Sequence, residues 1–159
     1  MPNDASVPRR RPIWVSASRV VPAPAERVYD IIADYRTGHP QILPARVFRD
    51  VCVETGGRGE GTIVRFGMRV FGAVKRFRAA VAEPEPGRVL VERDLNGNGS
   101  VTTFTVNRLG NGHAGVTIET AWTPKGPGAF VERLLAPLFL KRLYAEELFN
   151  LEKVATGEL

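Results

Sequence analysis

The end of the chain contains the feature that most limits its fold. Residues 129–156 have the pattern of one long helix, whereas most of the chain before them has the alternation of short strands. A single helix with an apolar face needs a sheet to cover it. A curved antiparallel sheet of six to seven strands wrapped around this helix meets that need, and the wrap leaves a cavity between the two. The sequence therefore predicts an α+β fold with an internal cavity.

The apolar face of this helix changes direction near Pro137. Leu134 and Leu138 lie on one side, whereas Tyr144 and Leu148 centre roughly a third of a turn away. Because proline removes a backbone hydrogen bond and crowds the preceding turn, we expect a kink or a break there. The first segment, which is apolar nearly all round, packs in the core, lines the cavity or contacts a second copy of the chain. We expect part of it to be a movable wall of the cavity, formed by Leu134, Leu135, Leu138 and Phe139.

The beginning of the folded part is predicted as a strand followed by two short helices. Residues 13–21 alternate and form the first strand. Pro24 suits a first helical turn, and Glu26 lies near the positive end of the helix dipole. Residues 25–35 then have apolar positions at helical spacing. A turn or second short helix follows over 36–43.

From residue 45 onward the apolar period changes to two, and turn residues recur about every ten positions. Asn-Gly steps such as Asn96-Gly97 favour tight hairpins, because glycine and asparagine accept positive φ. Connections this short force neighbouring strands to pair antiparallel. The alternation assigns these apolar side chains to the face that meets the helix: Val64, Phe66, Met68, Phe77, Phe104, Ile118 and Trp122.

One strand, 88–95, breaks this pattern. Its alternation places Val91 and Arg93 on the inward face. A buried arginine without a partner is costly. Arg93 therefore either lies at the rim or on a bulge that turns it outward, or it reaches into the cavity and contacts a carboxylate or enol oxygen of a ligand.

Composition limits the class of protein. A chain of 159 residues suits one domain, which we expect over 13–156 after a disordered basic leader at 1–12. No apolar run is long enough to span a bilayer, and the start lacks the order of a secretory signal, so a cytoplasmic protein is expected. Part of the net charge of +5 comes from three arginines in the leader, and nucleic-acid binding is not expected.

The sequence contains few signs of catalysis. Its only two histidines, His39 and His113, have no serine or cysteine arrangement typical of a triad, and they are too few to indicate a metal site. The glycine-rich stretch 57–61 is not followed by the helix of a phosphate loop. We therefore assign no catalytic residue, no metal and no cofactor. His39 and Tyr144 remain candidates for polar groups in the pocket or at its mouth.

The strand and helix from Val15 to Asp34 resemble the START and Bet v 1-like superfamily, often described as polyketide cyclase/dehydrase-like or SRPBCC. The most specific element is Ala-Pro-Ala-Glu-Arg-Val-Tyr-Asp at 23–30, and the resemblance extends over about 13–155 with the strand meander and the last helix. Residues 34–44 and 83–88 resemble a bacterial branch. The resemblance implies a helix-grip fold with an apolar cavity between the sheet and the last helix.

Members of this superfamily bind lipids, sterols, hormones or polyketides, and a minority catalyse cyclisation or dehydration. The resemblance thus favours a carrier or sensor that binds a small hydrophobic molecule such as a lipid, polyketide or aromatic compound. An enzyme of the cyclase or dehydratase type is the alternative, with His39, Arg93 or Tyr144 in acid–base roles. A protein-interaction module that assists chaperones is a second, weaker alternative. The sequence leaves open whether the chain is a monomer or a homodimer.

Overall fold

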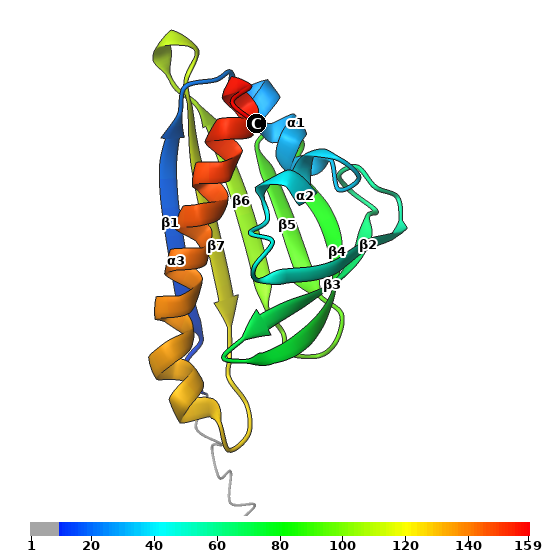
Figure 1. Cartoon of the computed structure of the whole chain (residues 1–159), viewed down its shortest axis with the longest axis vertical. Helices are drawn as coiled ribbons and strands as arrows, with labels where there is room; N and C mark the ends of the chain where they lie inside the picture. The colour runs from blue at the N-terminus through cyan, green and yellow to red at the C-terminus, as the bar shows by residue number, and fades with distance from the viewer. Residues whose placement is uncertain (1–9) are drawn as a thin grey trace, which may run out of the picture.

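The computed structural model describes residues 10–159, which form one curved antiparallel sheet and three α-helices (Figure 1). The strands are β1 (Ile13–Val21), β2 (Phe48–Thr55), β3 (Ile63–Val70), β4 (Ala73–Glu85), β5 (Val89–Asp94), β6 (Val101–Arg108) and β7 (Ala114–Trp122). The helices are α1 (Ala25–Ala33), α2 (Gly38–Ile42) and α3 (Ala129–Thr156). This is the predicted α+β helix-grip fold. The predicted leader, 1–12, lies mostly outside the described residues.

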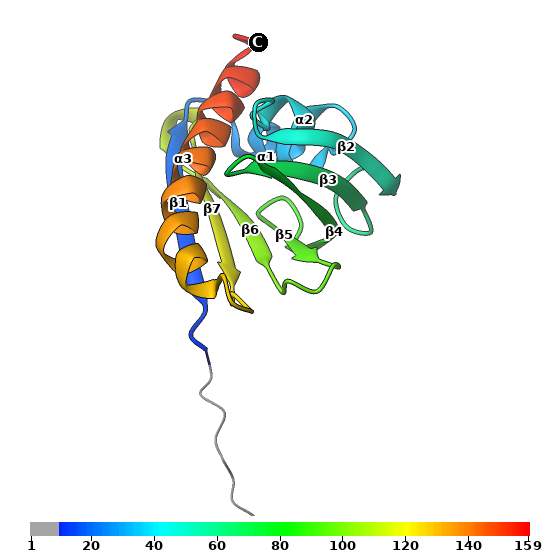
Figure 2. The ribbon, with the colours of Figure 1, turned by 60° about the horizontal axis from the view of Figure 1, so that its bottom comes forward.

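The sheet order β1-β7-β6-β5-β4-β3-β2 places the first strand beside the last. β1 and β7 pair without a register shift from Ile13↔Trp122 to Val21↔Ala114. All other neighbours in the sheet are consecutive in the chain, as the short connections predicted. The sheet curls so that β2, β3 and β4 lie opposite the side on which α3 packs (Figure 2).

The short helices α1 and α2 close one end of the curved sheet (Figure 1). Pro24 precedes α1 with φ −58°, and Glu26 lies in the first turn, as predicted. Val28 and Ile32 are completely buried, and they anchor α1 in the core. This packing fixes the segment that leads into α2.

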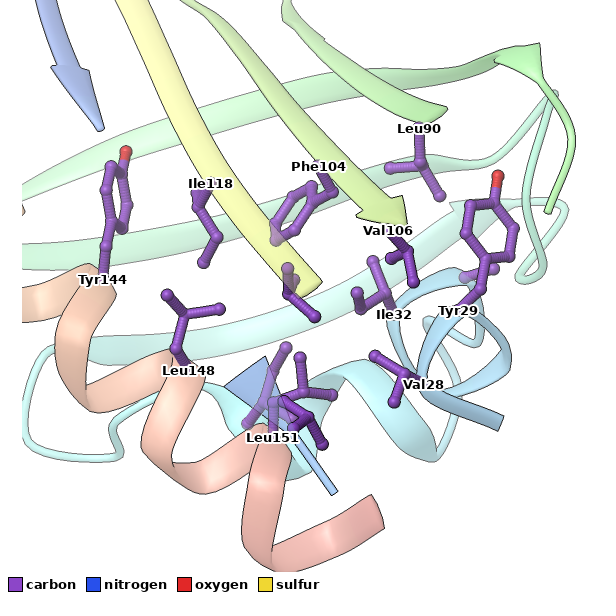
Figure 3. Packing of buried hydrophobic residues seen from close by; sticks show 14 of the residues in the cluster. Val28, Tyr29, Ile32, Leu90, Phe104, Val106, Ile118, Tyr144, Leu148 and Leu151 are labelled. Atoms are coloured by element: carbon purple, nitrogen blue, oxygen red, sulfur yellow. The ribbon is translucent and has the colours of Figure 1, made fainter. Parts of the chain in front are cut away.

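The core lies between the C-terminal half of α3, the short helices and the strands beside them. Leu148 and Leu151 are 1% exposed, and Leu148 points from α3 toward Ile118 on the sheet (Figure 3). In contrast, the first half of α3 exposes most of its large apolar side chains. The change of apolar face near Pro137 thus separates the C-terminal half of α3, which packs in the core, from the first half, which lies at the surface.

Of the kink or break predicted at Pro137, the break is wrong, because α3 is one helix from Ala129 to Thr156. Residues on both sides of the proline, Ala136 and Leu140, pack against the buried core. These contacts favour a continuous helix although Pro137 has no backbone N–H to donate, and the kink stays a prediction.

The inward orientation predicted for Val91 and Arg93 is also wrong. Leu90 is completely buried and pairs with Phe104, which places Leu90 and Glu92 on the inward face and leaves Arg93 exposed. The strand contains three consecutive apolar residues, 89–91, so its alternation does not define a face. Pairing with the core strand β6 decides the orientation instead.

Replacing Gly38, the first residue of α2, by alanine should destabilise the protein. An added Cβ would lie 2.6 Å from the carbonyl oxygen of Ile31, a backbone atom that cannot turn aside. Helix propensity alone would favour alanine by about 1 kcal/mol. We expect the clash to dominate and to lower the free energy of unfolding by about 1–3 kcal/mol in chemical denaturation.

Gly110→Ala is the matched control, because a Cβ there meets open space. An increase in stability for Gly38→Ala would show that α2 is free to shift and is not fixed by α1.

Candidate ligand-binding cavity

A cavity of about 1150 Å³ lies between the concave face of the sheet and α3. Cavities of roughly 300–1000 Å³ accommodate drug-sized ligands, so this one has room for such a molecule. Its walls come from α2, the strands β2 to β7 and the cavity-facing side of α3. The volume exists because α3 packs against β1, at the edge of the sheet, and leaves the strands beyond it uncovered.

The structure brings together most, but not all, of the residues predicted for the site. Those that line the cavity are His39, Val64, Phe66, Met68, Phe77, Phe104, Trp122, Phe139 and Tyr144. Ile118 packs in the core instead, and Val91 and Arg93 belong to the other face of the sheet. Direct contact of any of these residues with a ligand stays a prediction.

Of the four residues predicted as a movable wall on α3, only Phe139 lines the cavity, and its movement stays a prediction. Leu134 and Leu138 are 63% and 65% exposed, and with Leu135 they lie away from the cavity. Phe139 lines the cavity and contacts Phe71 with a ring distance of 5.9 Å. An all-apolar segment does not reveal which side faces inward, and the packing of α3 on β1 decides this.

Aromatic rings form much of the apolar wall. Phe66 lies between Phe48 and Phe77, with ring centroids 5.6 and 5.4 Å apart, and the pair with Phe77 is stacked. Trp122, on the far side, donates its indole N–H to Glu132 at 2.7 Å. Flat, apolar surfaces of this kind favour a ligand with an apolar or aromatic body.

A row of polar side chains crosses the concave face of the sheet. Glu92, Thr102 and Thr120 are direct neighbours on β5, β6 and β7. The hydroxyls of Thr102 and Thr120 are 2.8 Å apart, and that of Thr120 is 2.5 Å from the hydroxyl of Tyr144 on α3. The polar groups thus gather at one level of the cavity, near the core.

Two residues near the short helices, Tyr35 and His39, lie next to Glu92. The Tyr35 hydroxyl donates to Glu92 Oε1 at 2.5 Å, and burial together with this carboxylate raises the pKa of Tyr35 well above its usual value. His39 stacks on Tyr35, and its Nδ1 lies 2.7 Å from the Ile32 carbonyl. Because a carbonyl only accepts, Nδ1 carries a hydrogen, and Nε2 faces Glu92 Oε1 at 3.8 Å.

Glu147 completes this polar end from α3. It is 3% exposed, lines the cavity, and its side chain makes no hydrogen bond or ion pair with any of the residues 10–159. Burial, reinforced by the negative charges of Glu92 and Glu146, raises the pKa of Glu147 well above its ordinary value. Its carboxyl group is therefore available to a molecule in the cavity.

The opposite end of the cavity is its mouth and carries basic side chains. Lys75, Arg76 and Lys125 line it and are exposed. Lys75 lies six residues along β4 from Val81, the partner of Glu92, which corresponds to roughly 20 Å. The cavity therefore has an acidic inner end and a basic mouth.

Sequence reasoning missed Tyr35, Glu92, Thr102, Thr120 and Glu147 as parts of the site. A signal for Glu147 exists, because it occupies the same helix face as Tyr144 and Leu151, at spacings of three and four. An acid on an apolar face is unusual and indicates a site. No such signal exists for Glu92, since the orientation of its strand is ambiguous.

Comparison with known families agrees with this architecture. Residues 12–156 match the family described as polyketide cyclase / dehydrase and lipid transport. The chain belongs to this family. It is thereby a member of the START and Bet v 1-like superfamily, whose fold places a hydrophobic-ligand cavity beneath the last helix. A search of the curated proteins gave no match.

Solved structures of this family and superfamily are similar over nearly the whole chain. The solution structure of the KanY protein is 30% identical, with a TM-score of 0.80 over 92% of this chain and 99% of that one. The Zhui aromatase/cyclase from Streptomyces sp. R1128 is 19% identical, with a TM-score of 0.78 over 92% and 94%. A START superfamily protein from Mycobacterium smegmatis is 20% identical, with a TM-score of 0.64 over 91% and 95%. The last two show the shared fold.

Within residues 10–159, no helix is long and apolar enough to cross a membrane. Over residues 10–159, no three histidine, cysteine or acidic side chains gather as metal ligands would.

Replacing Glu147 by glutamine should change how stability depends on pH. Since the folded pKa lies above the ordinary 4.5, the unfolded chain loses this proton first as pH rises. The wild type is therefore destabilised progressively from about pH 4.5 up to the raised pKa, and the variant lacks this loss. The melting temperature of Glu147→Gln, relative to wild type, should increase between pH 4 and pH 7.5.

Glu152→Gln is the control, because Glu152 lies on the same helix, forms an ion pair with Arg19 and is not among the groups that raise the pKa of Glu147. Melting temperatures of wild type and Glu147→Gln that stay parallel over this pH range would contradict a protonated Glu147.

Proposed function

We propose that the chain binds a small molecule with an apolar body in the cavity between the sheet and α3, as a carrier or sensor. The observation that carries this proposal is the cavity of about 1150 Å³, lined mainly by apolar and aromatic side chains and closed at its inner end by polar ones. Such a combination favours burial of the body and orientation of one polar group.

The apolar wall supplies part of the affinity. A ligand that buries about 300 Å² of apolar surface gains roughly 7 kcal/mol from the hydrophobic effect, before the cost of its lost freedom is subtracted. A micromolar dissociation constant corresponds to about 8 kcal/mol, so the polar contacts at the inner end must contribute as well. The polar inner end then selects among ligands that fit the apolar part.

A cyclase or dehydratase type of reaction is the second candidate, and it is supported by the groups at the inner end. Glu92 lies beside Nε2 of His39, and Glu147 is a buried acid that faces the same space. Carboxyl groups with different environments can serve as acid and base. A carrier returns its ligand unchanged, whereas an enzyme yields a product, and Glu92→Gln would abolish that product in mass spectrometry.

Binding can be tested with a matched pair of tryptophan variants on α3. Leu140 lines the cavity, whereas Leu138, two residues away, is 65% exposed and does not. Leu140→Trp should fill part of the cavity and weaken binding of the neutral fluorophore N-phenyl-1-naphthylamine about tenfold, with Leu138→Trp close to wild type. Fluorescence titration measures both affinities, and thermal unfolding checks that both variants are folded.

Equal effects of the two substitutions would place the bound fluorophore outside the cavity. Native mass spectrometry of freshly purified protein supplies an independent measurement, in which a co-purifying ligand should be present in wild type and reduced in Leu140→Trp. A complete lack of binding by apolar compounds in both assays would overturn the proposed function.

A further inference from the structure

Hydrogen-bond acceptors outnumber donors at the inner end of the cavity. Glu92 receives one hydrogen bond, from Tyr35, although a carboxylate can accept about four. His39 uses its Nδ1 hydrogen on the Ile32 carbonyl, and its Nε2 lies 3.8 Å from the same carboxylate, beyond hydrogen-bond distance. The group missing from this end is a donor.

Glu147 adds to this imbalance from the opposite wall. Glu147 as a whole residue is 3% exposed, and its carboxyl group has no hydrogen-bonding partner among the described residues. Buried polar groups in proteins are almost always paired, so an unpaired one that faces a cavity indicates a ligand group. The three hydroxyls beside it, those of Thr102, Thr120 and Tyr144, form two hydrogen bonds with one another, which leaves a single hydroxyl hydrogen against several free carboxyl lone pairs.

The charge at this end is negative, and no lysine or arginine among residues 10–159 comes within ion-pair distance of Glu92 or Glu147. The basic groups that line the cavity, Lys75, Arg76 and Lys125, are at its mouth, and Arg76 faces Asp50. An anionic group would be repelled here. A hydroxyl would donate one hydrogen, whereas an ammonium group donates three and also neutralises charge.

We propose that the inner end of the cavity binds the protonated amine of a ligand with an apolar or aromatic body, with Glu92 and Glu147 accepting its hydrogen bonds. This deepens the proposed function and rests on it. The ammonium group lies between β5 and α3, and the body extends along the aromatic wall toward the mouth. Glu92 and Glu147 are positioned as ligand-binding residues.

Because burial raises the pKa of Glu147, an ammonium group beside it favours the ionised carboxylate, and binding should then be accompanied by proton release. The titratable or polar groups that face Glu147 are Glu92 on β5, His39 on α2, Tyr35 before it, and Tyr144 and Glu146 on α3. A positively charged ligand changes the net charge among these groups, whereas a neutral ligand does not. The affinity for an amine should therefore increase with pH up to the range in which the amine itself loses its proton, whereas the affinity for a neutral ligand should not.

The test compares two molecules of nearly the same shape, 2-(2-naphthyl)ethylamine and 2-(2-naphthyl)ethanol, by calorimetric titration of the full chain. The amine should bind about tenfold more tightly than the alcohol, as expected for hydrogen bonds to charged groups. Titration of wild type in two buffers of different ionisation enthalpy should detect proton release with the amine and none with the alcohol.

Glu92→Gln and Glu147→Gln should each remove most of the preference for the amine while they retain the affinity for the alcohol. Glu152→Gln, which changes a carboxylate of α3 that pairs with Arg19 and does not line the cavity, should keep the preference. The comparison of the amine with the alcohol also uses wild type, so it tests the proposal even where a variant fails to fold.

Equal affinity for the amine and the alcohol, or an amine preference that persists in both glutamine variants, would overturn the proposal. The same holds where neither naphthyl compound binds but N-phenyl-1-naphthylamine does, and in that case the proposed function stands. Where none of the three binds, the proposed function itself fails.

Discussion

The whole structure depends on the mismatch in width between one helix and seven strands. Six strand spacings of about 4.8 Å extend over roughly 30 Å, whereas a helix with its side chains is about 10–12 Å wide. α3 can therefore cover only part of the concave face, and it does so at the β1 edge. The remaining strands curl over, and the space beneath them becomes the cavity.

The two ends of that space differ because different elements close them. At the inner end, α2 and the C-terminal half of α3 pack into the core and carry Tyr35, His39 and Glu147 with them. At the mouth, only loops and a hairpin meet, and their exposed lysines remain in water. Electrostatic interactions of the buried inner carboxyl groups are therefore strong, whereas those of the charges at the mouth are screened by solvent.

The sequence was sufficient for the fold and for much of the apolar wall, but not for the polar end. Strand alternation assigned Phe66 and Phe104 to the concave face because their strands alternate cleanly. The same rule failed in β5, where Val89, Leu90 and Val91 are all apolar and only pairing with β6 fixes the orientation. It failed again on α3, because Leu134 and Leu138 belong to a segment that is apolar on every side and one side had to face outward.

The hydrogen bond between Tyr35 and Glu92 joins residues 57 positions apart, and Glu147 comes from the last helix. The polar end is therefore complete only after both ends of the chain have docked on the meander. Until α3 docks, the aromatic concave face is open to water and to other chains. A ligand that occupies the cavity favours the docked helix by mass action, so it also protects the newly made protein from aggregation.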